Sequence, residues 1–260
     1  MTSSVKVWLI GGTSDSRTVA QILSDRHIPW IATVVSPRAQ RLYKNLPGEI
    51  HAGPLTADAL PHWLREHHIT HIVDGSHPFA VEISSLAIAI PLPYLRYERP
   101  AVDLAPIVET HPNIVAVSTW DRLFAEALSR IQPRILLTTG LKSLQQVVPI
   151  LHRAQWWARV LPSSQESAIA LGFPRNRLIL QRPPVSVAAE KDQWQSLGIN
   201  TVLTKASGSA GGLPEKIAAA IALQTRLLIL QRPHLSYPHQ VQSGDGLSNH
   251  LDAWFGKKVC

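Results

Sequence analysis

The sequence contains almost no cysteine: the one cysteine among 260 residues is Cys260. A single cysteine excludes an intrachain disulfide and a cysteine-based zinc cage, and a reducing cytoplasm is the compartment we expect. Long apolar runs are also lacking, because no stretch approaches the roughly 20 residues that cross a bilayer. The apolar run before Gly11 is too short for a signal peptide. We therefore expect a soluble protein without membrane partners.

Clusters of like charge and of metal ligands are missing too. The net charge is +7, from 25 Lys and Arg against 18 Asp and Glu, which favours acidic partners. The basic residues are dispersed, without a nucleic-acid-binding module, so a small polyanion explains the surplus better than nucleic acid does. The histidines at 62, 67, 68 and 71 have no carboxylate or cysteine at ligand spacing, so no metal site is expected. A serine-hydrolase elbow is likewise missing.

What the chain does contain is a regular alternation of short Val/Ile/Leu-rich runs with helix-length segments. This alternation is typical of parallel sheets covered by helices, the α/β class. The expected strands are 5–10, 30–35, 49–51, 71–73, 94–96, 114–117, 135–138, 157–161, 178–180, 201–204 and 227–230. The expected helices are 57–67, 79–89, 120–130, 143–151, 166–171, 187–197, 214–223 and 247–255.

The length suits two domains of about 130 residues. The proline-rich stretch 99–112 has no clear period and is the expected crossing between them. The sequence therefore predicts an N-terminal dinucleotide-binding domain, 1–105, and a C-terminal substrate-binding domain, 106–260.

Two glycine-containing loops join a strand to a helix, one near each end of the chain. The first is Gly11-Gly12-Thr13, and the second runs from Lys205 to Gly212. Glycine lets a ligand approach the backbone, and the N–H groups at a helix start attract anions. Neither loop has the strict dinucleotide or P-loop spacing. The position after the first strand still favours phosphate binding over a plain turn, and two such loops suggest a shared cleft.

The end of the second strand indicates which cofactor is preferred. Ser36 and Arg38 stand where an NAD site usually has a carboxylate for the ribose hydroxyl, and they suit a 2′-phosphate instead. NADPH is therefore expected over NADH. The alternative is that Arg38 and Arg41 only solvate a loop, which leaves NADH open.

Polar groups follow several other expected strands. His77 could donate a proton, although Asp74, Ser76 and Pro78 around it are equally typical of a helix start, and this second interpretation is favoured by the stretch alone. Arg96 and Arg99 flank an acid and could clamp a polyacidic substrate, or form an ion pair that joins the domains. Weaker candidates of the same kind are Thr139, Gly140 and Arg159, whereas Ser207 and Gly208 belong to the second glycine loop, which is a stronger candidate with Lys205 nearby.

An ordered set of segments carries a resemblance to a known family. Up to about Pro233, the chain resembles the precorrin-6A reductases of cobalamin biosynthesis. The segments are Gly11-Gly12-Thr13, Asp74-Gly75-Ser76-His77-Pro78-Phe79-Ala80, Tyr94-Leu95-Arg96-Tyr97-Glu98-Arg99-Pro100, Leu137-Thr138-Thr139-Gly140, Ala158-Arg159-Val160-Leu161-Pro162, Thr204-Lys205-Ala206-Ser207-Gly208 with Gly211-Gly212, and Gln231-Arg232-Pro233. Two departures from the family pattern are Arg182-Pro183-Pro184-Val185 and Ala206, and they bear on substrate contacts nearby.

The resemblance implies two Rossmann-like domains with mainly parallel sheets and helices on both faces, between which a strand can be exchanged. It implies NADPH and a tetrapyrrole in the cleft between them, and hydride transfer to a ring double bond of precorrin-6A or cobalt-precorrin-6A. The cofactor-binding residues it suggests are Gly11, Gly12, Thr13, Ser36, Arg38 and Ser76. The substrate-binding residues it suggests are Arg96, Arg99, Thr139, Gly140, Arg159, Lys205, Ser207 and Gly208.

The final proton is expected from water or from His77. Two other classes stay open from sequence. A two-domain glycosyltransferase would bind a nucleotide sugar and ignore NADPH, and a non-catalytic NADP(H) sensor would bind the dinucleotide without oxidising it.

Overall fold

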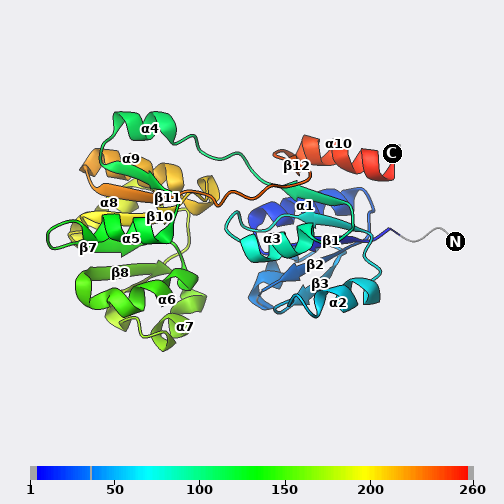
Figure 1. The fold of residues 1–260 in the computed structure, drawn as a ribbon, viewed down its shortest axis with the longest axis horizontal. Coiled ribbons are helices and arrows are strands. Elements are labelled where there is room, and N and C mark those ends of the chain that lie inside the picture. Colours follow the sequence, from blue (N-terminus) through cyan, green and yellow to red (C-terminus); the bar gives the residue numbers. More distant parts are fainter. Residues whose placement is uncertain (1–4, 36, 257–260) are drawn as a thin grey trace. The chain divides into compact units, whose positions relative to one another are not determined.

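The computed structural model describes residues 5–35 and 37–256, and the chain folds into two compact units. Unit 1 comprises the residues up to Pro100 together with those from Pro233 onward, and unit 2 comprises Ala101–Arg232. Figure 1 shows that each unit is a sheet with helices on both faces. The α/β class with parallel sheets is confirmed.

Unit 1 contains a six-stranded parallel sheet in the order β12-β5-β4-β1-β2-β3. Its strands are β1 (Val7–Ile10), β2 (Trp30–Val34), β3 (Glu49–Ala52), β4 (His71–Asp74), β5 (Tyr94–Tyr97) and β12 (Gln240–Val241). Its helices are α1 (Ser14–Asp25), α2 (Leu60–Glu66), α3 (Val81–Ile88) and α10 (Gly244–Phe255), with a 3-10 helix η1 (Pro37–Tyr43). The central strands β1 and β2 are buried along their whole length, as expected for strands covered on both faces.

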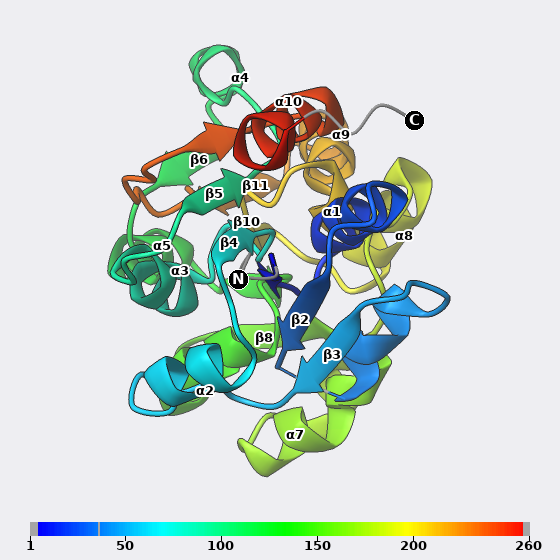
Figure 2. The ribbon, with the colours of Figure 1, turned by 90° about the vertical axis from the view of Figure 1, so that its right-hand side faces the viewer.

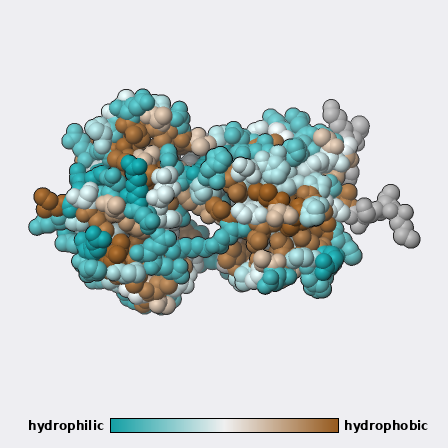
Figure 3. Space-filling model, in the orientation of Figure 1, coloured by the Kyte–Doolittle hydropathy of each residue, from teal (hydrophilic) through white to brown (hydrophobic). Residues whose placement is uncertain are grey.

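The two faces of this sheet carry different helix pairs. Val19 and Leu23 of α1 share one core cluster with Leu247 and Leu251 of α10. The helices α2 and α3 contribute to a second cluster on the other face, as Figure 2 shows. On the surface drawn in Figure 3, hydrophobic residues of unit 1 gather around α3, whose larger apolar side chains are only half-buried: Val81, Ile83, Leu86 and Ile88.

Unit 2 has a six-stranded parallel sheet in the order β6-β11-β10-β7-β8-β9. Its strands are β6 (Ile114–Val117), β7 (Arg134–Leu137), β8 (Gln155–Val160), β9 (Leu178–Leu180), β10 (Thr201–Lys205) and β11 (Arg226–Leu230). Its α-helices are α4 (Ala105–Thr110), α5 (Trp120–Leu128), α6 (Leu144–Val147), α7 (Gln165–Ala170), α8 (Val187–Ser196) and α9 (Leu213–Leu223). Short 3-10 turns are η2 (Leu141–Ser143), η3 (Val148–Arg153), η4 (Pro162–Ser164), η5 (Arg175–Arg177) and η6 (Ser209–Gly211).

The two sheets have the same strand order, and the strand at one edge of each sheet follows, in sequence, a strand of the other sheet. The strand β6 follows β5 of unit 1 in sequence but pairs with β11 of unit 2. The strand β12 follows β11 but pairs with β5, so that Gln240 lies beside Arg96. This topology is the strand exchange that the resemblance implies.

The predicted domain division therefore differs from the observed one. The first crossing, after Pro100, lies close to the expected boundary at 105/106. The segment 233–260 was predicted in the second domain, but it belongs to unit 1, because β12 adds to that sheet and α10 packs on α1. The expected helix 143–151 is also broken, into η2, α6 and η3. Within the described residues, none of the helices has both the length and the apolar character of a membrane span.

Candidate functional site

In unit 1 the chain first adds strands on one side of β1 and then, from β4 onward, on the other side. The carboxyl ends of β1 and β4 therefore form the switch point, the place where parallel α/β sheets bind ligands. The loops that follow these two strands are hydrogen-bonded to each other. The N–H of Gly75 donates to the carbonyl of Ile10 at 3.1 Å, and the hydroxyl of Thr13 donates to the carbonyl of Gly75 at 2.7 Å. The fold thus brings Gly11, Gly12 and Thr13 beside the loop that contains Ser76 and His77.

The first glycine loop is supported on one side by Tyr43, and it is open where a Cβ of Gly12 would point. A Cβ on Gly11 would lie 2.2 Å from the Tyr43 hydroxyl, so only glycine fits there. Gly12 has a φ of +101°, and no heavy atom lies within 4 Å of where its Cβ would be. The N–H of Gly12 donates to the Tyr43 hydroxyl at 2.9 Å, and that hydroxyl shares a 2.7 Å hydrogen bond with Ser16. Burial raises the pKa of Tyr43, which keeps the hydroxyl protonated as a support for the loop.

The helix α1 begins with a reciprocal cap. The N–H of Ser16 donates to the Thr13 side chain, and the N–H of Thr13 donates to the Ser16 side chain, both at 3.0 Å. The Asp15 carboxylate in the first turn is paired with Arg99 at 3.0 Å. A helix start attracts anions, and the negative charge of Asp15 opposes that attraction. The ion pair with Arg99 offsets this charge. Arg99 is therefore part of the first loop's surroundings.

Arg96 lies in the interior of unit 1. Its side chain is 0% exposed and donates to Asp74 at 2.8 Å and to Glu98 at 2.9 Å. It also donates to the carbonyl of Ser76 at 3.1 Å and the Ser76 hydroxyl at 3.0 Å. Arg96 and Asp74 are register partners on β5 and β4, so this ion pair holds the sheet and its loop together. A direct clamp on substrate needs exposed surface, which Arg96 does not have, and its pair with Glu98 lies within one unit.

Ser76 and His77 are positioned by the same network. The N–H of Ser76 donates to Asp74 at 2.9 Å, and Asp74 also accepts from Ser84 at 2.6 Å and from Tyr94 at 2.8 Å. Burial and the adjacent Asp74 carboxylate raise the pKa of Tyr94. The Nδ1 atom of His77 accepts the N–H of Phe79 at 3.2 Å, so the neutral ring carries its proton on Nε2.

Two residues, Ser36 and Arg38, are expected near a 2′-phosphate. Arg38 is an exposed residue of η1. Ser36 lies outside the described residues.

Unit 2 repeats the switch point between β7 and β10. After β7, the Thr139 and Ser143 hydroxyls are 2.6 Å apart, and Ser143 donates to the carbonyl of Gly140 at 2.6 Å. Gly140 has a φ of +89°, with open space where a Cβ would be. Thr139 and Gly140 thus form a compact turn that corresponds to the first glycine loop of unit 1.

Lys205 is the last residue of β10, and Ser207 and Gly208 lie in the loop that follows. Gly208 has a φ of +72°, which favours glycine, and the N–H of Ser207 donates to the carbonyl of Lys205 at 2.7 Å. The Lys205 ammonium lies 5.3 Å from the centre of the Trp120 ring. Burial, and then the positive charge of Lys142, lower the pKa of Lys205 to about 8.

Arg159 is a buried structural cation. It is 5% exposed and forms a two-pronged pair with Glu190, with both N–H···O distances at 2.6 Å. Gln193 also accepts from Arg159. Like Arg96, it lacks the exposure that direct substrate contact requires, although the sequence placed it among the substrate-binding residues.

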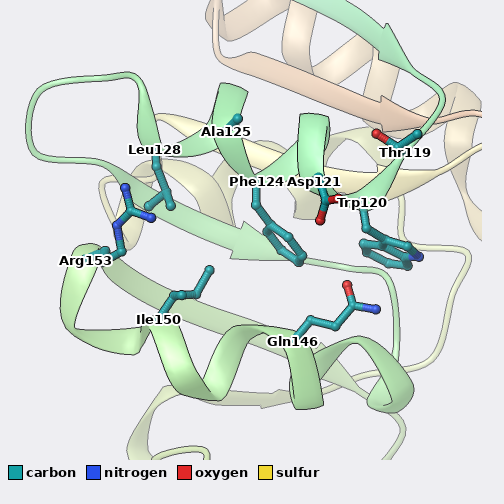
Figure 4. Close-up of a pocket in the computed structure, with 9 residues that line it drawn as sticks. All are labelled: Thr119, Trp120, Asp121, Phe124, Ala125, Leu128, Gln146, Ile150 and Arg153. Atoms are coloured by element: carbon teal, nitrogen blue, oxygen red, sulfur yellow. The ribbon is translucent and has the colours of Figure 1, made fainter.

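A cavity of about 850 Å³ lies between α5 and the α6–η3 segment of unit 2. Figure 4 shows Trp120 and Phe124 beside it from α5, facing Gln146 and Ile150. Trp120 stacks on Phe124 with ring centres 5.8 Å apart, and its other neighbour is Lys205. The sequence analysis did not identify this cavity, although aromatic residues four apart on the expected helix 120–130 were the available signal.

The family model and the relatives described next match nearly the whole chain. The model of the family "Precorrin-6x reductase CbiJ/CobK" matches residues 6–252. The cobalt-precorrin-6A reductase of Synechocystis sp. is 38% identical over 251 residues, covering 92% of each chain. That of Priestia megaterium is 32% identical, covering 89% of this chain and 92% of the relative. The precorrin-6A reductase of Rhodococcus erythropolis is 30% identical over 96% of this chain and 97% of its own.

A solved structure, described as CobK precorrin-6A reductase, superposes with a TM-score of 0.76 at 18% identity, covering 98% of this chain and 100% of that one. It confirms the fold of two Rossmann-like units. A family of reductases disfavours the glycosyltransferase alternative. On the family match and these relatives, the chain belongs to the precorrin-6x reductase family.

Proposed function

We propose that this chain transfers a hydride from NADPH to a ring double bond of precorrin-6A or cobalt-precorrin-6A, giving the 6B form in cobalamin biosynthesis. The observation that carries the proposal is the family match over residues 6–252, which includes the switch-point loops of both units. The enzyme class is an oxidoreductase that acts on a CH–CH group, and a reductase of this family implies a nicotinamide cofactor.

The first glycine loop fits a dinucleotide diphosphate. The space above Gly12 is open, the loop is rigidly supported, and α1 begins directly behind it. The N–H groups of Gly12 and Thr13 are bonded inside the loop, so we assign the anion to the first turn of α1 and the open face of Gly12. Arg38, and Ser36 outside the described residues, would favour the 2′-phosphate of NADPH. When bound, the cofactor supplies the hydride.

Polar groups at the ends of β7 and β10 in unit 2 suit a polycarboxylate substrate. Lys205 ends β10, Ser207 and Gly208 follow it, and Thr139 and Gly140 follow the neighbouring strand β7. Lys205, Ser207 and Gly140 are half-buried, whereas Thr139 and Gly208 are buried and contribute to the shape of the loops. We assign the substrate's acetate and propionate groups to these residues. The net charge of +7 favours the approach of such a substrate. Arg96 and Arg159 then act from the interior, and Arg99 acts at the cofactor loop.

In this proposal, the protein's contribution to the reaction is mainly alignment. Holding two reactants in attack geometry lowers a barrier by about 7 to 11 kcal/mol, so no strong acid or base is required. His77, in its doubly protonated imidazolium form, is the proposed proton donor that completes the reduction and becomes neutral as it does so, and water is the alternative. A His77→Ala variant that keeps full turnover would assign the proton to water.

The direct test follows NADPH absorbance under anaerobic conditions after precorrin-6A or its cobalt form is added. The expected result is a loss of NADPH that depends on both enzyme and tetrapyrrole, and that is faster than with NADH. Binding of NADPH without its oxidation in the presence of either tetrapyrrole would contradict the proposal and would indicate a sensor.

A further inference from the structure

A buried lysine holds the second glycine loop from inside unit 2. Lys216, the fourth residue of α9, is 2% exposed. Its ammonium donates to the carbonyl of Gly211 at 2.7 Å and to the carbonyl of Gly212 at 3.1 Å. Two consecutive carbonyls bonded to one cation fix the direction of the backbone at the end of the loop.

The end of the loop that Lys216 holds packs against Ser207 near the start of the loop. A Cβ on Gly211 would lie 2.5 Å from the Cβ of Ser207, so the backbone of Gly211 packs directly against this serine. The N–H of Gly211 also donates to the carbonyl of Gly208 at 3.1 Å. A shift of Gly211 must therefore move Ser207, and Lys205 is two residues before it.

Lys216 is itself anchored by buried charge. Its ammonium lies 3.7 Å from Glu190, a carboxylate with 0% exposure. Glu190 also pairs with Arg159 and accepts the ring N–H of Trp194 at 3.0 Å. Burial lowers the pKa of Lys216 to about 8, and the Glu190 charge opposes this shift, so the ammonium form persists at neutral pH. Removing one member of this cluster would leave another charge buried without its counterpart, so unit 2 is stabilised only when all three side chains are present.

The equivalent position in unit 1 performs the equivalent task. Ser84 is the fourth residue of α3, the helix that follows β4, and it donates to Asp74 at the base of the preceding loop at 2.6 Å. In both units, therefore, the fourth residue of the helix after the switch-point loop reaches back to hold the base or the end of that loop.

We propose that Lys216 is a positioning residue, which fixes the loop Ala206–Gly212 so that Lys205 and Ser207 meet the substrate's carboxylates. This inference rests on the proposed function, because that function assigns the carboxylates to this loop. It also gives Arg159 a role: the arginine holds Glu190, and Glu190 holds Lys216.

The test is a Lys216→Met variant assayed with NADPH and the tetrapyrrole. Misplacing binding groups by about 1 Å costs up to about 100-fold, so we expect KM for the tetrapyrrole to rise about tenfold or more. The KM and Kd for NADPH should stay at the wild-type values, because unit 1 is unaltered. Lys191→Met, on the adjacent helix α8, is the matched control and should leave both KM values unchanged.

Two further measurements separate positioning from stability. Gly211→Ala, whose new Cβ would push Ser207, should raise the tetrapyrrole KM even with Lys216 intact. Hydrogen exchange should be faster at residues 207–212 in Lys216→Met, or in Lys216→Gln if the Met variant does not fold. Wild-type tetrapyrrole KM in Gly211→Ala, or in a folded Lys216 variant, would overturn the inference, whatever the change in Tm. Inactive wild-type enzyme would instead contradict the proposed function.

Discussion

The hydroxyl of Thr13 donates a 2.7 Å hydrogen bond to the carbonyl of Gly75, and this bond joins the two loops at the switch point of unit 1. The same hydroxyl accepts the N–H of Ser16, so one side chain both caps α1 and ties it to the loop after β4. A Cβ on Gly75 would lie 2.9 Å from the Cα of Ser16, which shows how closely the two loops pack. The proposed cofactor site is thus built by contacts between segments about 60 residues apart in sequence.

Replacing Thr13 with Val removes the hydroxyl and keeps the shape. Loss of an N-cap costs about 1 kcal/mol, and we expect stability to fall by about that amount. NADPH binding should weaken about fivefold, because the first turn of α1 is no longer held to the loop. Thr13→Ser retains both hydrogen bonds and serves as the control. Calorimetric titration measures the affinities, and equal affinity in Thr13→Val and wild type would contradict the assignment.

The sequence predicted most strands because many of them are short, buried apolar runs, such as Val7–Ile10. It missed β12, since Gln240–Val241 is too short and too polar for a pattern to show. The return of 233–260 to unit 1 could not be predicted by composition either, because the packing of Leu247 and Leu251 on α1 involves residues more than 200 positions apart.

For the candidate site, the sequence predicted which residues lie near the ends of strands, but it did not predict where their side chains point. Arg96 and Arg159 have the expected position at the ends of strands, yet both point to buried carboxylates. Their partners Asp74 and Glu190 are 22 and 31 residues away, beyond any local pattern. The support from Tyr43 was missed for the same reason. The requirement for glycine in the first loop could be predicted, because it depends on local backbone geometry, and cofactor binding by this loop stays a prediction.

Arg96 and Arg99 should respond differently to mutation. Removing one partner of a buried ion pair costs about 3 to 5 kcal/mol, and Arg96→Met should destabilise unit 1 by that order. Arg99→Met should cost about 1 kcal/mol or less, since its pair with Asp15 is partly exposed. It should weaken NADPH binding about two- to fivefold, because the Asp15 charge at the helix start is no longer offset.

Urea unfolding measures the stabilities of these two variants, and calorimetry measures the affinities. A stable Arg96→Met protein with an elevated tetrapyrrole KM would show that Arg96 contacts substrate directly.

Lys205 should make substrate binding depend on pH. Its pKa is lowered to about 8 by burial and by Lys142, so the amine loses its charge as pH rises through that value. The tetrapyrrole KM should therefore rise between pH 7 and about pH 9. Lys205→Arg keeps a charge over this range and should flatten the profile, whereas Lys205→Met should raise KM at every pH. A wild-type profile that Lys205→Arg leaves unaltered would exclude Lys205 as the group that titrates.

Acid should loosen the docking of α10 on unit 1. The centre of the His71 ring lies 4.9 Å from the centre of the Trp254 ring and 4.6 Å from that of the Phe255 ring. Burial lowers the pKa of His71. The folded state then prefers the neutral ring, so its stabilising contribution is complete above the unfolded pKa of about 6.5 and is lost as pH falls below it. His250 of α10, with a pKa lowered by burial and by His239, acts in the same direction.

Urea unfolding at pH 7.5 and 5.5 tests this dependence. His71→Phe should lose less stability on acidification than the wild type, while His62→Phe, at an exposed position of α2, should behave like the wild type. Equal losses in His71→Phe and wild type would rule out a contribution from His71.

The most direct measurement is a single turnover with NADPH in which both hydrogens at the reactive carbon of the nicotinamide are replaced by deuterium, followed by mass spectrometry of the tetrapyrrole. The account predicts one deuterium in each reduced tetrapyrrole and one NADPH consumed for each product formed, with Thr13→Val slowed when NADPH is limiting. A product without deuterium, or NADPH left unconsumed while the tetrapyrrole is bound, would contradict it.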